Sequence, residues 1–290
     1  MAFLEVGAAE ESKSLDLSRT NLKIWPPFSL RFVDIMQVMP HEQVDPQRVA
    51  KLKQRLQTEG ILMDPPMVMQ AENYYIVLDG ATRLTALKEL GYPHLVVQVI
   101  SAAEVMGLHT WNHALCNIAP DHLIELLGQL AEIELVATTA DHVLTHNDLC
   151  YLQTVAGVCF LLRPKVRQNW LVALNKLTES YIQASQVQRT IERDLLTLHD
   201  EFPTLAALII FPEFTVKQVL QVAQSAHFFP AGITRFIIHG RVLRLNVDLA
   251  VLKSSQTLVE KNHWLHDFLV QKLNLGKIRY YEEPIYLLDG

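Results

Sequence analysis

The chain has 290 residues, of which 50% are hydrophobic and 19% charged, and its formal net charge at pH 7 is −6. This composition is that of a folded globular protein with enough chain for two domains, and it excludes a disordered protein. The acidic balance argues against a nucleic-acid partner, because proteins that bind duplex phosphates usually carry a basic surplus. The cysteines lack metal-ligand spacing and are expected to be buried reduced thiols: Cys116, Cys150 and Cys159.

The N-terminal residues include acidic side chains and no apolar run, so the sequence predicts no signal peptide. The longest apolar stretches, such as Val155–Leu162, are too short to span a bilayer. We therefore expect a cytoplasmic protein with no membrane partner. The sequence leaves its oligomeric state open.

The first third of the chain has the pattern of a compact α/β unit. Hydrophobic periodicity predicts a strand over 30–38, a helix over 46–58, strands over 66–70 and 74–78, a helix over 81–90 and a strand over 95–100. Asp45 and Pro46 form a helix start, because an aspartate caps free N–H groups and proline suits the first helical position. Gly60 is expected to end that helix.

The remaining chain also mixes helical and strand patterns. We expect helices over 121–131, 163–200, 215–226 and 257–273, and strands over 133–137, 151–162, 205–211, 233–238, 242–247 and 278–288. No internal repeat or low-complexity linker is present, so the two halves should pack tightly. The predicted fold class is α/β, with a nucleotide-binding domain over 28–103 packed on a larger α/β domain over 104–290 that completes a substrate cleft.

The strongest local motif is the segment Tyr75–Leu87, in which an apolar strand runs into Gly80 and a helix starts at once. A helix N-terminus offers free N–H groups and the positive end of the dipole, and glycine lets a phosphate approach the backbone. Thr82 adds a hydroxyl and Arg83 a forked cation. Gly80, Ala81, Thr82 and Arg83 therefore predict a phosphate-binding turn, although an ordinary strand-to-helix turn fits the spacing equally well.

The first domain resembles the ParB N-terminal domain and its relative sulfiredoxin. The matching residues are Arg48, Leu52, Gly60, Pro66 and the run Gly80-Ala-Thr-Arg83. The resemblance implies that this turn holds nucleotide phosphates. A sulfiredoxin-like reductase is disfavoured, because its nucleophilic cysteine lies within this turn and no cysteine is present there.

Further motifs resemble the free L-serine kinases of this superfamily, which phosphorylate L-serine to O-phosphoserine. These motifs are Met39-Pro-His-Glu-Gln-Val-Asp-Pro, Leu78-Asp-Gly-x-x-Arg, Thr110-Trp-Asn-His, Gly232-Ile-Thr-Arg-Phe-Ile-Ile and Gly240-Arg-Val-Leu. The resemblance implies a small-molecule kinase with Mg²⁺ and with ATP or ADP as phosphoryl donor. Its acceptor would be free L-serine or a related amino acid or alcohol.

The resemblance also assigns roles to single residues. Glu42 would be the catalytic base, and Asp79 would act beside it near the Mg²⁺ ion and the hydroxyl. Trp111 and Thr234 would line the serine pocket, and Arg235 would offer a cation to the substrate carboxylate or a phosphate. These residue types suit phosphoryl transfer, because one carboxylate can take the hydroxyl proton while another holds the metal ion.

The chain departs from the kinases at Ala81, Thr82 and Phe236, where they commonly carry histidines. These departures leave two alternatives open: a catalytically lapsed ligand sensor, or a nucleotide-binding ParB-like transcriptional regulator. A regulator should carry a helix-turn-helix and a basic face, and the sequence predicts neither after residue 101. Each proposed site residue also fits a structural role, as a helix cap, a surface charge or core packing.

Overall fold

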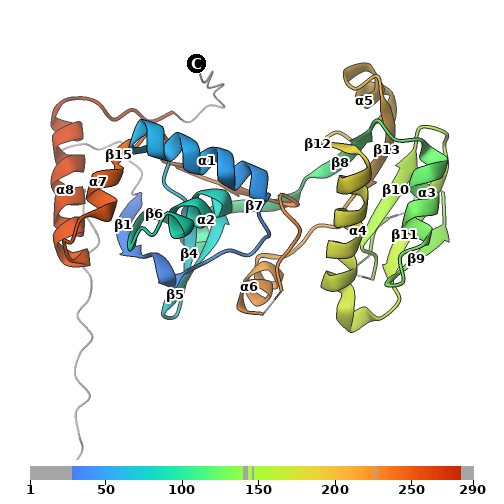
Figure 1. The fold of residues 1–290 in the computed structure, drawn as a ribbon, viewed down its shortest axis with the longest axis horizontal. Coiled ribbons are helices and arrows are strands. Elements are labelled where there is room, and N and C mark those ends of the chain that lie inside the picture. The colour runs from blue at the N-terminus through green and yellow to red at the C-terminus, as the bar shows by residue number, and fades with distance from the viewer. Residues whose placement is uncertain (1–27, 140–142, 146, 226, 282–290) are drawn as a thin grey trace, which may run out of the picture.

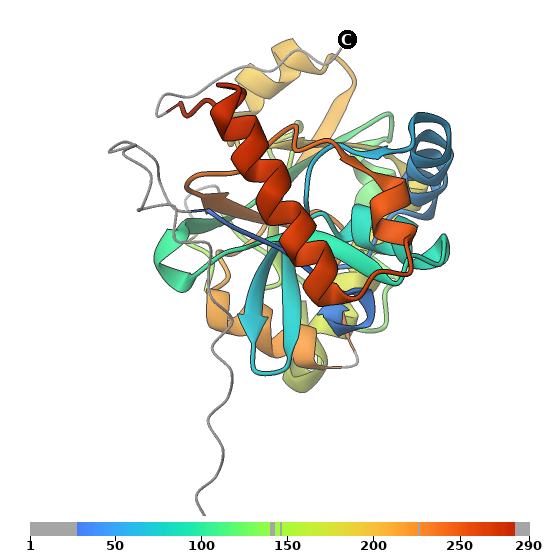
Figure 2. The ribbon, with the colours of Figure 1, turned by 90° about the vertical axis from the view of Figure 1, so that its left-hand side faces the viewer.

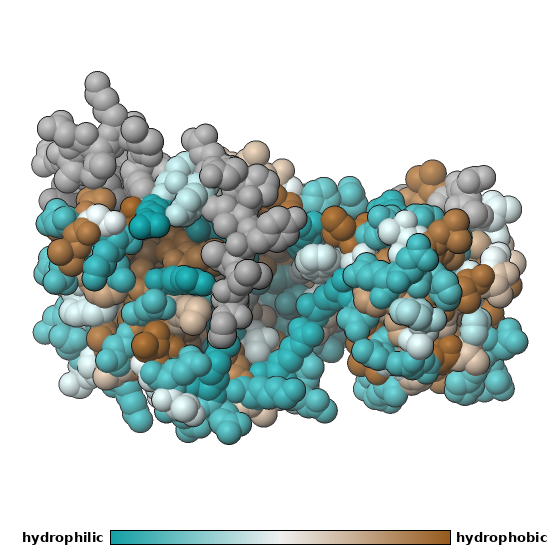
Figure 3. Space-filling view, turned by 90° about the horizontal axis from the view of Figure 1, so that it is seen from above, coloured by the Kyte–Doolittle hydropathy of each residue, from teal (hydrophilic) through white to brown (hydrophobic). Residues whose placement is uncertain are grey.

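The computed structural model describes residues 28–139, 143–145, 147–225 and 227–281. Figure 1 shows two lobes side by side along the long axis of the molecule, joined by a narrower middle section. Seen from above, the surface is hollowed between the lobes, and the side chains that border the hollow are largely hydrophilic (Figure 3).

The first lobe is built on a five-stranded mixed sheet. Its strands are β1 (Ser29–Asp34), β2 (Val38–Met39), β4 (Met67–Ala71), β5 (Tyr74–Asp79) and β6 (His94–Val99). Their order in the sheet is β1-β6-β4-β5-β2, with β4 antiparallel to β5 and parallel to β6. Helices α1 (Pro46–Glu59) and α2 (Ala81–Glu89) bury apolar side chains in the same core as the sheet. The predicted order of elements is confirmed.

Local signals explain how these elements begin and end. Asp45 caps α1 by accepting a hydrogen bond from the Gln47 N–H at 2.8 Å, and Gly60 ends it at φ +68°. The predicted strand over 30–38 is wrong in one respect, because a 3₁₀ turn at Ile35–Gln37 separates β1 from β2. The side chain of Asp34 accepts a hydrogen bond from the Met36 N–H and stabilises this turn.

The end of the described chain returns to the first lobe. Strand β15 (Val247–Asp248) pairs with β3 (Ile61–Leu62), and helices α7 (Leu249–Lys253) and α8 (Leu258–Asn274) follow. Helix α8 lies across the lobe in Figure 2, and its Asn262 side chain hydrogen-bonds both the N–H and the carbonyl of Phe32 in β1. Leucines of α7 and α8 therefore share the core of the first lobe. The division into 28–103 and 104–290 stays a prediction.

The second lobe is a six-stranded antiparallel sheet between helices. Its strands are β8 (Asn112–Cys116), β9 (Ile133–Ala137), β10 (Cys150–Thr154), β11 (Cys159–Pro164), β12 (Gln186–Thr190) and β13 (Leu205–Ile210), in the order β12-β8-β13-β10-β11-β9. Helices α3 (Pro120–Gly128) and α4 (Trp170–Ala184) pack on one face, and α5 (Leu195–Glu201) packs on the other. Alternate strand residues supply the two cores, as a sheet covered on both faces requires.

Three predictions in this half of the chain need correction. The helix predicted over 163–200 is interrupted, because residues 186–190 pair with β8 as an edge strand. These residues include the β-branched Val187 and Thr190, which suit a strand, and the partner strand β8 lies far away in the sequence. The strand predicted over 242–247 survives only at Val247 in β15, and residues 278–281 are not a strand. Residues 282–288 of that last prediction lie outside the described chain. The three cysteines are buried, as expected.

A two-stranded ribbon joins the lobes. Strand β7 (Val105–Thr110) pairs antiparallel with β14 (Thr234–Ile238), and helix α6 (Val216–Gln224) lies beside this middle section in Figure 1. The ribbon carries two of the predicted substrate-binding segments into the space between the lobes. Among the described residues, no helix is long and apolar enough to cross a membrane.

Candidate functional site

The turn that contains Glu42 is fastened to the segment before β14. Glu42 and Phe229 form a short parallel bridge, in which the Gln43 N–H donates to the Phe229 carbonyl at 2.7 Å and the Phe229 N–H donates to the His41 carbonyl at 2.9 Å. Two motifs that are almost 190 residues apart in the sequence therefore lie side by side. This contact joins the first lobe to the middle section.

The carboxylate of Glu42 lies in this bridge and is largely buried. Its Oε2 atom accepts a hydrogen bond from the Gly232 N–H at 2.9 Å and lies 3.4 Å from Thr234 Oγ1. Burial raises the pKa of Glu42 from 4.5 to about 7, and the charge of Asp79 adds to this effect, while the Gly232 N–H and the Arg189 charge oppose it. A carboxyl group that titrates near neutral pH is suited to proton transfer.

His41, to which the sequence assigned no role, orients the hydroxyl of Thr234. Its ring is 1% exposed, with Nδ1 against the Val77 carbonyl and Nε2 2.7 Å from Thr234 Oγ1. A carbonyl can only accept, so Nδ1 carries the proton and Nε2 accepts from the threonine hydroxyl. Burial lowers the pKa of His41 to about 4, which keeps the ring neutral. The hydroxyl proton therefore points mainly to His41, and its 3.4 Å contact with Glu42 Oε2 is the weaker of the two.

The predicted phosphate turn has the geometry of an anion site. Gly80 is the N-cap residue of α2 at φ +102°, and no side chain caps the first N–H groups of the helix. A Cβ atom on Gly80 would lie 3.0 Å from Pro66 Cβ and 3.0 Å from Arg83 Nη2. Glycine is therefore required here by both backbone conformation and space. The N–H groups of Ala81 and Thr82 lie at the positive end of the helix, where an anion is stabilised.

The arginine of this turn is already bound to the protein. Arg83 Nη1 donates to the carbonyls of Asp64 at 2.9 Å and Pro65 at 3.3 Å, and its Nη2 donates to Asp79 Oδ2 at 2.7 Å. Arg241, whose side chain is 44% exposed, also donates to Asp79 Oδ2 at 2.6 Å. Arg83 therefore stabilises the turn by tying Asp79 to the carbonyls of Asp64 and Pro65, and Arg241 is the more accessible cation beside the turn.

Trp111 and Arg235 form a separate pair. The guanidinium of Arg235 lies 4.8 Å from the centre of the Trp111 ring, in a cation–π contact. Thr234 and Phe236 both contact His41, so Arg235 between them projects from the opposite face of β14. The structure thus brings Glu42, Asp79, Thr234 and the Gly80 turn toward one region, whereas Trp111 and Arg235 contact each other.

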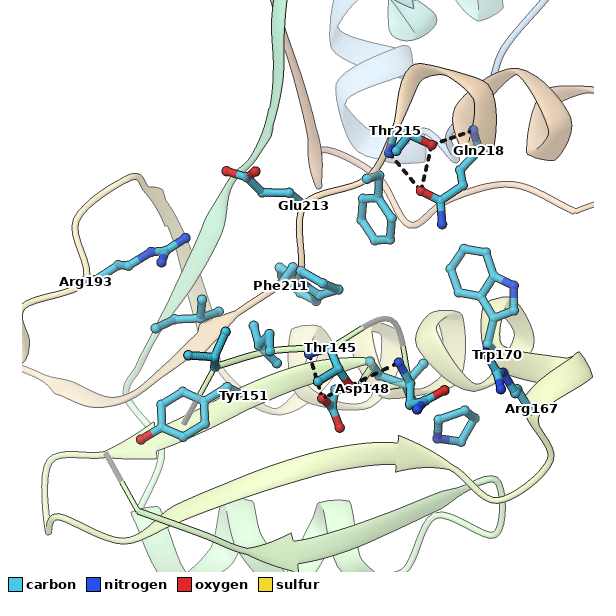
Figure 4. A pocket seen from close by; sticks show the side chains of 18 of the residues that line it. Thr145, Asp148, Tyr151, Arg167, Trp170, Arg193, Phe211, Glu213, Thr215 and Gln218 are labelled. Carbon is cyan, nitrogen blue, oxygen red and sulfur yellow. Dashed lines mark hydrogen bonds between the residues drawn. The ribbon is translucent and has the colours of Figure 1, made fainter. Parts of the chain in front are cut away.

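A cavity of about 1010 Å³ lies in the second lobe and extends to the first turn of α6, and none of the predicted site residues lines it. Figure 4 shows Trp170 and Phe211 along its walls and Arg167 and Arg193 at its ends. Stacked and edge-on contacts among Trp170, Phe214 and Phe229 separate it from the Glu42 turn. The cavity is therefore distinct from the site that the motifs predict.

The chain has the fold of the free serine kinases. No protein-family model matches it. The structure of SbnI with a C-terminal truncation, from Staphylococcus aureus, superposes with a TM-score of 0.70 at 24% identity, covering 84% of this chain and 97% of that chain. A free serine kinase in complex with AMP superposes with a TM-score of 0.66 at 16% identity, covering 77% and 93%.

Two proteins that are similar in sequence carry names of the same class. The ATP-dependent L-serine kinase SbnI of Staphylococcus aureus is 26% identical over 264 residues, which cover 90% of this chain and 97% of the relative. The ATP-dependent L-serine kinase of Staphylothermus marinus is 32% identical over 107 residues, which cover 35% of this chain and 42% of the relative. The predicted α/β fold class and the resemblance to the free L-serine kinases are therefore confirmed.

Proposed function

We propose that the protein is an ATP-dependent kinase of free L-serine, which transfers a phosphoryl group to the serine hydroxyl and releases O-phosphoserine. The observation that carries the proposal is the environment of Glu42, a buried carboxyl with a pKa near 7 held between the lobes by Gly232. The names of the two relatives support both the acceptor and ATP as donor.

The proposed mechanism assigns proton transfer to Glu42. As the phosphoryl group approaches, the serine hydroxyl loses its proton to this carboxylate. Thr234 supports this role, because His41 holds its hydroxyl in one orientation beside the carboxylate. The Gly80 turn would hold donor phosphates through the N–H groups of α2, so that most of the rate comes from positioning and charge stabilisation.

Asp79 would hold Mg²⁺ together with the donor phosphates. Among the described residues, no group of three or more His, Cys, Asp and Glu side chains could hold a metal ion. One carboxylate still fits, because Mg²⁺ often takes one or two protein oxygens and completes its shell with phosphates and water. Both arginine contacts of Asp79 involve Oδ2, which leaves Oδ1 for the ion. The ion would offset phosphate charge during transfer.

A second candidate, a catalytically lapsed ligand sensor, is favoured by one specific observation. Phe236 occupies a position where the kinases resembled by this chain commonly carry histidine, and its ring packs edge-on against His41 at 5.8 Å. Ala81 and Thr82 likewise present no imidazole at the phosphate turn. A sensor would bind the nucleotide and the amino acid without turnover, so a turnover measurement separates it from a kinase.

Phosphorus NMR of the protein with Mg²⁺ tests the proposal directly. The donors are ATP and ADP, and the acceptors are L-serine, L-threonine, L-homoserine and ethanolamine. We expect a phosphomonoester signal with ATP and L-serine that Glu42→Gln abolishes. Glu125→Gln, an exposed carboxylate change on α3 in the second lobe, should leave the signal intact. No signal from any pair at stoichiometric enzyme would disprove kinase activity and leave the sensor.

A further inference from the structure

Arg189 lies against the glycine that holds Glu42. Its guanidinium occupies the space in which any side chain at position 232 would project, since a Cβ atom on Gly232 would lie 1.8 Å from Arg189 Nη2 and 1.9 Å from its Cζ. Gly232 adopts φ +71°, and its N–H donates to Glu42 Oε2 at 2.9 Å. Arg189 of the second lobe and Glu42 of the first lobe therefore both contact Gly232.

Among the residues that the structure describes, few hydrogen-bond partners occupy the N–H groups of Arg189. Its Nη2 makes one long hydrogen bond, to the Ala231 carbonyl at 3.4 Å, and the side chain is exposed. Within the described part of the chain, Arg189 forms no ion pair, either with Glu42 or with another acid. A guanidinium has five N–H donors in a planar fork, so most of them remain for a ligand.

The charges around Arg189 favour an anion. Partial burial of the guanidinium lowers the pKa of Arg189, although the residue keeps an exposed side, and the nearby positive charge of Arg48 lowers it further. Arg48 has a single acidic partner, Asp45, at 3.7 Å, and its own side chain is 61% exposed. When Glu42 is protonated, the surroundings of Arg189 therefore hold two cations, Arg189 and Arg48, and the single carboxylate of Asp45. An incoming anion would relieve the repulsion between the two arginines.

Three other cations near the site already have partners. Arg235 stacks on Trp111 on the opposite face of β14, while Arg83 and Arg241 hold Asp79 at the phosphate turn. In serine only the α and β carbons separate the carboxylate from the hydroxyl. When the serine hydroxyl contacts Glu42, the serine carboxylate therefore lies only a few bonds away from Glu42. Of the described cations, the one at that place with free N–H groups is Arg189, which forms no ion pair with Glu42. A forked guanidinium suits a carboxylate through two parallel hydrogen bonds.

We propose that Arg189 binds the α-carboxylate of the acceptor and thereby restricts the enzyme to hydroxyl substrates that carry a carboxylate. The inference rests on the proposed kinase function and adds its specificity determinant. Arg189 contacts the substrate at the end opposite the reacting hydroxyl, so its removal should discriminate between acceptors with and without a carboxylate.

Rate measurements with L-serine and L-serinamide test the inference, because serinamide keeps the hydroxyl and amine but lacks the carboxylate charge. At a pH high enough for Glu42 to be fully charged in both proteins, Arg189→Met should lower kcat/KM for L-serine about 100-fold, as loss of a charge-assisted bidentate contact predicts, and leave serinamide nearly unchanged. Arg189→Lys should recover part of the L-serine rate. Arg193→Met, which removes a similarly exposed arginine from the second-lobe cavity, should leave both rates unchanged. An equal fall for both acceptors, or no fall for L-serine, would overturn the inference.

Two further measurements use readouts that a merely structural role of Arg189 would not change, and the second of them needs no turnover. The Arg189 charge lowers the pKa of Glu42, so the acid limb of the serinamide rate profile should move to higher pH in Arg189→Met. Calorimetry without nucleotide should show L-serine binding that this substitution abolishes and Arg193→Met preserves. If the wild-type protein binds L-serine in this way but phosphorylates nothing, the kinase proposal fails and the carboxylate site stands. Binding that is absent, or unaffected by Arg189→Met, refutes the carboxylate site.

Discussion

Replacing Glu42 with glutamine should stabilise the folded protein at pH 8 while it removes the proposed base. Burial raises the pKa of Glu42 from 4.5 to about 7, and the surroundings include the opposing charges of Asp79 and Arg189 and the neutral ring of His41. Each pKa unit corresponds to about 1.4 kcal/mol, so the charged carboxylate costs the folded state about 3 kcal/mol at pH 8. Well below pH 4.5 the group is neutral in both states, and the cost disappears.

Urea unfolding at pH 8 and pH 5, followed by tryptophan fluorescence, measures this cost. The amide of Glu42→Gln keeps an oxygen to accept the Gly232 hydrogen bond, so the variant changes charge with little change in shape. We expect a gain of about 3 kcal/mol in unfolding free energy at pH 8 and less than about 1 kcal/mol at pH 5. Glu125→Gln, on the exposed surface of α3, should show no such dependence. A gain of the same size at both pH values would refute the reasoning, since it would show that Glu42 does not titrate between them.

Three further changes have expected outcomes. The rate of phosphotransfer should rise with pH through about 7, because Glu42 accepts a proton only in its charged form; a pH-rate profile that is flat from 6 to 8 contradicts this role. Gly80→Ala should destabilise the protein by about 1–3 kcal/mol and weaken nucleotide binding, because φ is +102° and Pro66 Cβ lies 3.0 Å from the added atom; thermal unfolding and nucleotide titration measure both effects. Arg163→Met should cost about 2 kcal/mol at neutral pH by removing the 2.8 Å contact to the buried carboxylate of Asp148, and unfolding at falling pH should show this loss shrink as that carboxylate becomes protonated.

Local sequence signals predicted the parts of the site that form within a short stretch of chain. The strand that runs into Gly80 and the helix that follows required only hydrophobic periodicity and a glycine at the junction. The cap at Asp45 and the end of α1 at Gly60 were likewise local. Glu42 and Thr234 were identified from motifs, but their spacing said nothing about the 3.4 Å that separates their side-chain oxygens.

The conformation of residues 186–190 is set by pairing with a distant strand and could not be predicted from hydrophobic periodicity. Residues 186–190 lie within a segment whose apolar spacing predicts helix, and they become β12 because β8 offers an unpaired edge. The role inferred for Arg189 depends on that strand, since only the sheet brings its guanidinium to Gly232. No pattern near Arg189 in the sequence indicates a site.

The sequence by itself determined the α/β class, the order of the main elements in the first lobe and the strand-to-helix turn at Gly80, and it predicted residues whose chemistry suits phosphoryl transfer. Only the tertiary structure decided that His41 orients Thr234, that Arg83 is committed to the protein, and that Arg235 turns away from Glu42. The physical reason is that helix and strand propensity act over a few neighbouring residues. The protonation and orientation of a buried group depend instead on contacts between segments that are distant in the sequence.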